Sequence, residues 1–310
     1  MKVLILKPRL DVSFKEGPVP EKRGTVLPIR VHWEKFVNNL YIFHKSRGDS
    51  TRVLEKPLWQ MSTQDVPKDT DLVYIPHKDK NRFFVDHSKC LYYMQMVFPW
   101  LFEVAEEGPF SLSTRFPQKI YPEINRTLLD RLLKRVSKKE SKFDQPTSDS
   151  INFKNYVLFV GQMERDEAIQ IHSKISVKES LIKTIIYCAN QKLDLLFKPH
   201  PFDRDRKLIT AARNNGIPIV NNNIFDLLQN CSCVVTVNSG VGMEAIICNK
   251  PVFFYGEAEY SPVAFNANNE FRFNDRNKYI NKYPEFLTSY FKDRIDSESI
   301  ESYKYIESFL

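Results

Sequence analysis

Three side chains that could take part in a reaction follow an apolar run in the middle of the chain. Gln162, Glu164 and Asp166 come soon after Tyr156–Val160. A glycosyl-transfer centre needs a carboxylate near the anomeric carbon, because the transition state there is oxocarbenium-like and carries positive charge. The two acids are therefore candidates for that position. The alternative is that they only stabilise the start of a helix, where the helix dipole favours negative charge.

A second turn brings a cation and an imidazole to the end of another apolar run, Leu193–Phe197. Its residues are Lys198, Pro199, His200 and Pro201. The prolines fix the backbone of this turn and restrict the residue before each of them. A stiff cationic turn suits the positioning of a phosphate group, although a His-Pro pair on its own is also a common loop feature.

A third turn is built from small residues and lies between a predicted strand and a predicted helix. It contains Asn238, Ser239, Gly240 and Gly242. Its backbone amides and the helix N-terminus would favour an anion. The turn lacks the third glycine of a dinucleotide fingerprint and the Gly-Lys-Ser/Thr of a P-loop, which argues against NAD and ATP. The alternative is that Ser239 only caps the helix and the glycines only form the turn.

Two features of the first half could act on an acceptor. Glu106 and Glu107 precede a Gly-Pro break, and two neighbouring acids can raise the pKa of one carboxyl group and make it a usable base. His77, Lys78 and Lys80 form a cationic patch that could hold an acceptor. The alternatives are a solvated helix end for the acids and a plain surface loop for the cations.

The second half alternates strands and helices, and this order would position the three turns. The helix predicted over Ser176–Asn190 opens with a capping box of Ser176 and Glu179, and Asp205–Asn215 and Val241–Cys248 are shorter helical candidates. Such alternation predicts a parallel sheet in a Rossmann-like domain, whose ligands bind beyond the carboxyl ends of the strands. The predicted strands are Tyr156–Val160, Leu193–Phe197, Ile217–Val220, Cys233–Val237 and Val252–Tyr255.

The first half is less regular and predicts a second α/β lobe. Lys2–Leu6 and Leu72–Ile75 are typical of buried strands, and Trp33–His44 and Cys90–Val97 of helices. The segment Ser137–Asn152 is polar, charged and contains a proline, so it predicts a linker between the halves.

These elements predict three parts of the chain. Residues 1–145 would form an acceptor-side α/β lobe, and residues 146–275 the Rossmann-like lobe. Residues 276–310 would form a helical tail that packs across the lobes, because aromatic residues alternate there with charged ones as in an amphipathic helix. Contact of this tail with a membrane is the alternative.

Composition limits the classes to which the protein can belong. Its 310 residues, 42% of them hydrophobic, can supply two domain cores. No stretch approaches the roughly 18 to 20 apolar residues of a membrane span, and charge near the start interrupts any signal peptide, so we expect a cytoplasmic protein. The net charge of +7 and the pI near 9.0 indicate anionic partners. Nucleic acid is not expected among them, because zinc-finger, RNA-recognition and long basic motifs are missing from the sequence.

Five short motifs follow one another along the chain. They are Glu106–Phe110, Gln162-x-x-x-Asp166, His200-Pro201, Asn238–Ala245 and Gly256–Tyr260. Together they resemble the capsule-polysaccharide biosynthesis family of retaining β-Kdo transferases, which shares motif logic with bacterial sialyltransferases of the GT-B fold. In that family the first motif contains the acid associated with acceptor activation, the second opens the donor domain, and the third holds the CMP phosphate.

The resemblance implies a transferase of GT-B type, with two Rossmann-like lobes and the active site in the cleft between them. CMP-Kdo would be the donor and a bacterial surface glycan or glycolipid the acceptor, with neither metal nor cofactor. Retention implies double displacement, in which Asp166 attacks the anomeric carbon, with Glu164 as the competing nucleophile, and Glu107 deprotonates an acceptor hydroxyl. The donor site implied by the resemblance consists of Gln162, Lys198, His200, Pro201, Asn238, Ser239, Gly240, Gly242 and Glu244.

Two other hypotheses stay open from the sequence. One is a sialyltransferase, or a transferase for another CMP-linked nonulosonic acid. The other is a catalytically silent sugar- or lipid-binding subunit of a polysaccharide assembly complex, in which the tail from Tyr279 to Leu310 would be the working part. Peripheral contact with the inner membrane is compatible with each of them.

Overall fold

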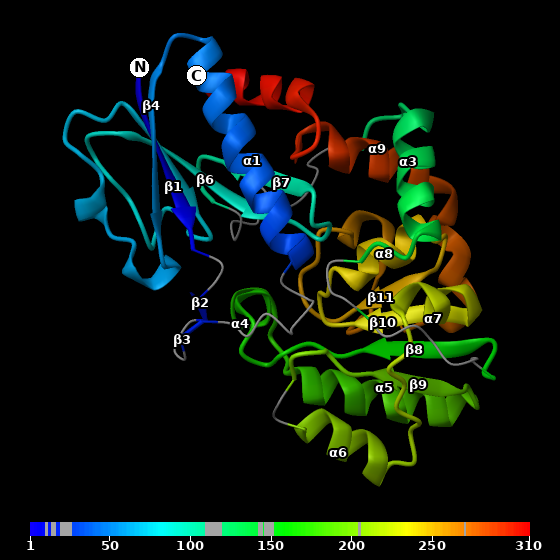
Figure 1. The fold of residues 1–310 in the computed structure, drawn as a ribbon. Helices are drawn as coiled ribbons and strands as arrows, with labels where there is room; N and C mark the ends of the chain where they lie inside the picture. Colours follow the sequence, from blue (N-terminus) through cyan, green and yellow to red (C-terminus); the bar gives the residue numbers. More distant parts are fainter. Residues whose placement is uncertain are drawn as a thin grey trace. The chain divides into compact units, whose positions relative to one another are not determined.

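The structure is a computed structural model, which describes residues 1–9, 12–13, 17–18, 27–108, 120–141, 145, 152–203, 206–269 and 271–310. These residues form two compact α/β units (Figure 1). The first unit comprises the described residues up to 108 together with 291–310, and the second comprises the described residues from 120 to 290. Pro109, the proline of the Gly-Pro break, and much of the predicted linker lie outside the described residues.

The first unit is built on a six-stranded sheet. Its strands are β1 (Lys2–Pro8), β4 (Ser50–Lys56), β5 (Leu72–Pro76), β6 (Lys89–Gln95), β7 (Leu101–Ala105) and β13 (Ile295–Asp296). The strand order is β13-β7-β6-β5-β1-β4. The four strands from β6 to β4 are parallel, whereas β7 and β13 each run antiparallel to their neighbours. A separate short antiparallel pair consists of β2 (Val12–Ser13) and β3 (Gly17–Pro18).

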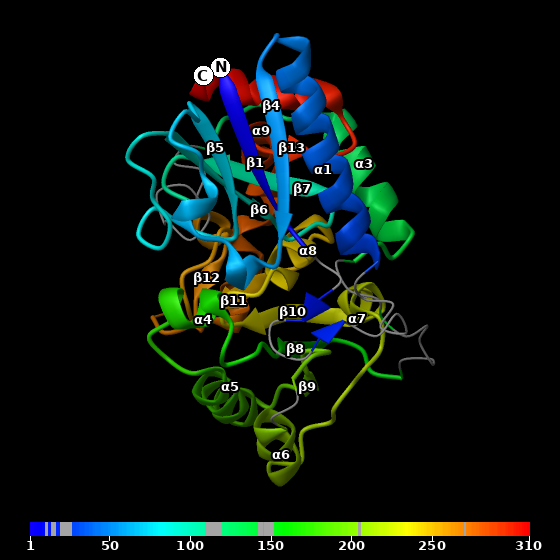
Figure 2. The ribbon, with the colours of Figure 1, turned by 60° about the vertical axis from the view of Figure 1, so that its left-hand side comes forward.

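Both faces of this sheet are covered by apolar side chains. Helix α1 (Leu27–Ser46) lies along one face (Figure 2). Its Phe36 and Leu40 share a core with Ile5 of β1. On the opposite face, Leu6 shares a second core with Val66, which lies in the segment that leads into β5. The short 3₁₀ helices of this unit are η1 (Leu58–Gln60), η2 (Thr63–Asp65) and η5 (Ile300–Phe309).

The helix predicted at Cys90–Val97 is wrong, because this segment forms strand β6. Leu91 and Tyr93 lie in the core on the α1 face, whereas Cys90 and Tyr92 lie in the opposite core. A strand buried on both faces is a continuous apolar run without the alternation that identifies a half-exposed strand. The two tyrosines were the available signal, because aromatic residues are enriched in strands.

The second unit has a five-stranded parallel sheet with helices on both faces. Its strands are β8 (Tyr156–Val160), β9 (Leu195–Lys198), β10 (Cys231–Thr236), β11 (Val252–Phe254) and β12 (Phe265–Asn266). Its helices are α3 (Arg126–Ser137), α4 (Glu167–His172), α5 (Val177–Gln191), α6 (Lys207–Asn214), α7 (Ile224–Asn230), α8 (Val241–Ile247), η3 (Ser261–Val263) and η4 (Phe273–Lys282). Helices α5 and α6 cover one face, and α7 and α8 the other (Figures 1 and 2).

Most of the predicted elements of the second half are confirmed within a few residues. Ser176 caps α5 and accepts a hydrogen bond from the Glu179 amide at 3.0 Å, as its sequence predicts. The strand predicted at Ile217–Val220 is wrong, since it is reduced to a single bridge between Ile219 and Phe197. Pro218 lies inside this segment and has no N–H to donate to a sheet ladder.

The division of the chain by contacts differs from the boundaries that the sequence suggested. Helix α3 precedes residue 145 but belongs to the second unit, where Ser141 donates a hydrogen bond to Glu244 and Lys139 forms an ion pair with Asp226. Helix α9 (Tyr283–Lys292) begins in the second unit, and the residues after Tyr290 belong to the first.

Four aromatic side chains of the tail are buried within the protein. Tyr283, Phe286 and Tyr290 are at most 1% exposed, and Phe291 is 8% exposed. They therefore present little apolar surface to a membrane. Among the helices of the described residues, none is both long enough and apolar enough to cross a bilayer.

Candidate functional site

The strand order of the second unit defines where a ligand crevice should lie. Starting from β8, the chain moves to β9 on one side and then to β10 on the other. The order reverses between β8 and β10, and open α/β sheets bind ligands beyond the carboxyl ends of the strands at such a point. The three predicted turns follow β8, β9 and β10 and so share this edge of the sheet.

A buried amide pair joins two of the turns at this reversal. Gln162 Nε2 donates to Asn238 Oδ1 at 2.9 Å, and the backbone N–H of Asn238 donates to Gln162 Oε1 at 3.0 Å. Asn238 Nδ2 donates to the carbonyl of Ala168 at 2.7 Å, and the Thr236 hydroxyl lies 3.2 Å from Gln162 Oε1. Gln162 is 5% exposed and Asn238 9%. Both residues, predicted to bind the donor, thus hold the loops after β8 and β10 together.

The two predicted catalytic acids of this unit both cap helices. Asp166 is the N-cap of α4, and its Oδ1 accepts from the Ala168 amide at 3.0 Å. Glu164 Oε1 accepts from the Lys178 amide in the first turn of α5 at 2.9 Å. Each carboxylate has a second oxygen that makes no hydrogen bond within the described part of the chain. Capping fixes the orientation of each side chain and leaves one oxygen for chemistry.

The small-residue turn is held in shape by an aromatic ring. Tyr260 donates its hydroxyl to the carbonyl of Ser239 at 3.0 Å. The ring also lies against Gly242, where an added Cβ would be 2.2 Å from the Tyr260 Cζ. Gly240 is exposed and Ser239 half-buried, so the turn reaches the surface on one side and packs on the other. The sequence indicated Tyr260 only through the last motif of the resemblance, without its role.

Lys198 carries a positive charge into a nearly dry environment. Its side chain is buried, and Nζ donates to the carbonyl of Asn222 at 2.7 Å. Burial lowers the pKa of Lys198 to about 8, and the nearby carboxylate of Glu244 opposes this shift. Glu244 is itself 3% exposed and accepts a hydrogen bond from Ser141 at 3.0 Å. Ser141 lies in the predicted linker, and its type and spacing gave no sign of this contact.

The next turn presents the imidazole of His200 with a defined polarity. The Phe202 amide donates to His200 Nδ1 at 3.1 Å. Nδ1 must therefore be unprotonated, which places the proton of the neutral ring on Nε2 and makes that atom a donor suited to a phosphate oxygen. Pro201 is exposed and follows at the outer end of the turn.

For the CMP-linked donor that the resemblance implies, the depressed pKa of Lys198 predicts an affinity for CMP that depends on pH. As the pH rises through about 8, the ammonium group loses its proton and its attraction for phosphate. We expect the dissociation constant for CMP to rise on the order of tenfold between pH 7 and pH 9 in titration calorimetry. The Lys198→Met variant should bind CMP weakly without this dependence.

The free energy of unfolding should rise with pH above pH 8, while the affinity for CMP falls. The unfolded state binds more protons than the folded state between pH 8 and 10.5, so the Lys198 contribution to the free energy of unfolding rises with pH there. A fall in CMP affinity without a fall in melting temperature would therefore identify the side-chain charge as the cause. An affinity that stays constant across pH 8 would contradict the assignment.

The first unit has a reversal of its own, between β1 and β5. His77 follows β5 directly, has a left-handed backbone with φ of 52°, and stacks on the buried ring of Trp33 at 5.0 Å between centroids. Strained backbone of this kind costs on the order of 1–3 kcal/mol and clusters at functional sites. The sequence identified His77 only as part of a cationic patch.

Glu107 lies beside the cationic patch of the first unit. It follows β7, which runs antiparallel to β6, and the neighbouring Glu106 forms a 3.0 Å ion pair with Lys89, the first residue of β6. The side chain of Glu107 is exposed, and its carbonyl accepts from the Lys80 amide at 3.2 Å. A Cβ added at Gly108 would lie 2.6 Å from Asp79 Cα, so Glu107 and Gly108 pack against the loop that follows His77.

The described residues contain no group of three or more His, Cys, Asp or Glu side chains arranged to hold a metal ion. The reaction without metal implied by the resemblance stays a prediction.

Comparison with known proteins places this site in a family context. The family model for capsule polysaccharide biosynthesis proteins matches residues 115–285. The capsule polysaccharide export protein KpsS of Escherichia coli is 29% identical over 119 residues, which cover 34% of this chain and 31% of KpsS. The chain thus spans about a third of that relative's length.

Two solved structures of KpsC from Thermosulfurimonas dismutans are similar in fold. Its β-Kdo 2,7 transferase has a TM-score of 0.54 and 15% identity, with 100% of both chains covered. Its β-Kdo 2,4 transferase has a TM-score of 0.51 and 14% identity, with 92% of this chain and 90% of the other covered. At these identities the likeness shows the fold, and the predicted α/β class of GT-B type with two lobes is confirmed.

Proposed function

The chain belongs to the family of capsule polysaccharide biosynthesis proteins, and from that premise we propose that it is a retaining glycosyltransferase that moves Kdo from CMP-Kdo to a glycan or glycolipid acceptor. Two proteins with the same fold are β-Kdo transferases, which favours Kdo as the sugar. The motifs of the sequence favour a CMP-linked donor. The residues at the edge of the second sheet offer the chemistry that such a donor needs.

The observation that carries the proposal is the buried bonding of Gln162 to Asn238 at the strand reversal. This bonding fixes the loop that contains Asp166 to the turn that contains Ser239. A carboxylate with one oxygen left for chemistry and a turn of small residues are thereby fixed at the place where open α/β sheets bind ligands. Lys198 brings a cation to the end of the adjacent strand β9. A carboxylate for the sugar and cationic or amide groups for the phosphate are the two requirements of transfer from a sugar nucleotide.

In the proposed first step, the phosphate of CMP-Kdo is bound by His200 Nε2–H and by the Ser239–Gly242 turn, with Glu244 near the nucleotide. Asp166 attacks the anomeric carbon, the bond between that carbon and the phosphate oxygen breaks, and CMP leaves with the bonding electron pair. The positive charge of Lys198 stabilises the negative charge that develops on the phosphate. The product is a glycosyl ester of Asp166.

In the proposed second step, an acceptor hydroxyl attacks the same carbon and releases the Asp166 carboxylate. Glu107 takes the proton of that hydroxyl. Two inversions give overall retention, and the donor phosphate supplies the leaving group without a metal. The cationic patch of His77, Lys78 and Lys80 could hold the acceptor, and its first residue, His77, follows β5 at the strand reversal.

Release of CMP is the direct test of this function. The protein is incubated with CMP-Kdo and, separately, with CMP-sialate, in the presence of capsule-derived acceptor, and free CMP is measured. Release from CMP-Kdo alone supports the proposal. Release from CMP-sialate alone would replace it by a sialyltransferase, and binding of glycan without release of CMP from either donor would indicate a silent subunit.

Replacement of His200 by Asn tests the phosphate site. The Asn side-chain oxygen can accept from the Phe202 amide in place of Nδ1, so the turn keeps its shape, while the Nε2 donor is lost. We expect CMP to bind on the order of 10- to 100-fold more weakly, because a hydrogen bond to a charged group contributes roughly 1.5–3 kcal/mol. Unchanged CMP affinity, measured by calorimetry, would remove His200 from the donor site.

A further inference from the structure

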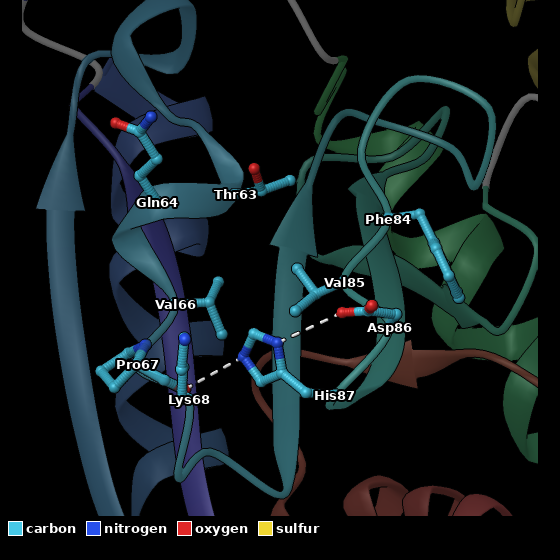
Figure 3. Close-up of a pocket in the computed structure, with 9 residues that line it drawn as sticks. All are labelled: Thr63, Gln64, Val66, Pro67, Lys68, Phe84, Val85, Asp86 and His87. Carbon is cyan, nitrogen blue, oxygen red and sulfur yellow. Dashed lines mark hydrogen bonds and ion pairs between the residues drawn. The ribbon is translucent and has the colours of Figure 1, made fainter.

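A cavity of about 760 Å³ opens on the first unit, on the sheet face opposite α1 (Figure 3). Its walls come from the segment that leads into β5 and from the segment that leads into β6. This volume lies within the range of roughly 300–1,000 Å³ typical of small-molecule sites. The lining residues are Thr63, Gln64, Val66, Pro67, Lys68, Phe84, Val85, Asp86 and His87.

The floor of the cavity is rigid because it belongs to the core. Val66 and Val85 are 4% and 3% exposed and share one apolar cluster. His87 joins the two walls, because its Nε2 donates to the carbonyl of Pro67 at 3.2 Å. A second connection runs from the Ser88 hydroxyl to the carbonyl of Thr70 at 2.7 Å. A ligand would therefore meet a preformed surface and order little chain on binding.

The rim combines an aromatic ring with cations and hydroxyl-binding groups. The ring of Phe84 is 52% exposed, and the Lys80 ammonium group lies over it at 5.9 Å from the centroid. Lys68 is exposed and has no carboxylate partner within the described part of the chain. Asp86 is 92% exposed and lies 3.4 Å from His87 Nδ1. Apolar contact, the ammonium group of Lys68 and a carboxylate acceptor thus line one opening, and the Lys80 ammonium group lies over the Phe84 ring beside it.

This combination matches an acidic sugar better than other small molecules. The C–H faces of a pyranose pack on an aromatic ring, its hydroxyl groups donate to carboxylate and amide oxygens, and its carboxylate pairs with an ammonium group. The two exposed apolar side chains of the rim, Phe84 and Pro67, are too few for a fatty chain. The cavity also lacks the arginine fork that favours bidentate phosphate binding.

We propose that this cavity binds one acidic sugar unit of the glycan on which the protein acts, as an anchoring subsite apart from the strand reversals. The inference rests on the proposed function, because that function supplies the acidic glycan. Its role is to hold a longer chain by a second attachment point. Multivalent attachment of this kind raises the apparent affinity for long chains without changing the chemistry.

Sugar binding is measured first, with the imidazole of His87 as the reporter. The probe is the methyl glycoside of Kdo, with methyl glucoside as the neutral control, and the His87 ring resonances are followed by NMR. We expect the Kdo glycoside to shift them and the glucoside to leave them unmoved. Lys68→Ala should remove the shift, whereas the matched control Lys45→Ala, at an exposed lysine on α1, should retain it.

The failure of this inference can be told apart from failure of the proposed function. Transfer is compared for a long and a short acceptor, and kcat/KM for the long acceptor divided by that for the short one should fall about tenfold, or about 1.4 kcal/mol, in Lys68→Ala and Phe84→Ala. An unchanged ratio together with unmoved His87 resonances overturns the anchoring subsite. Absence of transfer by the wild-type protein overturns the proposed function, while the His87 shift still tests the cavity.

Discussion

The Asp166→Asn protein is expected to lose sugar transfer while keeping its fold and its affinity for CMP. Asparagine is as good an N-cap as aspartate, so its side-chain oxygen still accepts from the Ala168 amide and α4 still begins at Glu167. An amide cannot form the glycosyl ester that double displacement requires. We expect the transfer rate to fall by about three orders of magnitude or more, as it does when a nucleophile is removed.

Two companion variants separate catalysis from helix capping. Asp166→Ala loses the helix cap as well, so its free energy of unfolding should be about 1 kcal/mol lower than that of Asp166→Asn. Glu164→Gln keeps an acceptor for the Lys178 amide and should retain most of its activity. Transfer is measured by CMP release, and the covalent sugar by mass spectrometry of the intact protein. Substantial turnover by Asp166→Asn would remove Asp166 as nucleophile, and an adduct on Glu164 would assign the role there.

The sequence predicted the second unit well because local signals there agree with the tertiary fold. A capping serine, strand-length apolar runs and a glycine turn each report the element in which they lie. Ile217–Val220 does lie beside β9, with hydrogen bonds from the Phe197 amide to the Pro218 carbonyl and from the Val220 amide to the Phe197 carbonyl, but the pairing extends no further than one bridge. Pro218 was the local sign against it.

The prediction of the first unit was limited by burial on both faces. Strand β6 is an apolar run buried on both faces, and periodicity does not separate such a strand from a buried helix. The cavity around His87 was also beyond the reach of the sequence. It depends on two segments that come together only because each leads into a neighbouring strand, and neither segment contains a recognisable motif.

For the candidate site, the types of residues in the sequence indicated where the site lies better than they indicated what each residue does there. Gln162 and Asn238 were identified as donor-binding residues, yet their amide groups are bonded to each other and to the backbone. A sequence motif does not distinguish a residue that touches a ligand from one that holds the loop that does. The contact between Glu107 and Lys80 shows a related limit, because the sequence indicated both residues without indicating that they are neighbours.

The largest structural effect in the candidate site is expected from Gly242→Ala. Gly242 is not among the residues with positive φ, so alanine would meet no backbone strain and, inside α8, would favour the helix by up to about 1 kcal/mol. The new Cβ would nevertheless stand 2.2 Å from the Tyr260 ring. That ring is held by its hydrogen bond to Ser239 and by its edge-to-face contact with Phe254 at 6.0 Å.

Relief of the clash must move either the ring or the turn. We expect Gly242→Ala to lower the free energy of unfolding by about 1–3 kcal/mol, the usual cost of overpacking, and to weaken CMP binding because the turn is displaced. A double-mutant cycle with Tyr260→Ala identifies the cause, since alanine at 242 should become neutral or stabilising once the ring is gone. The same destabilisation in both backgrounds, measured by urea unfolding, would show that the Tyr260 ring does not set the shape of the turn.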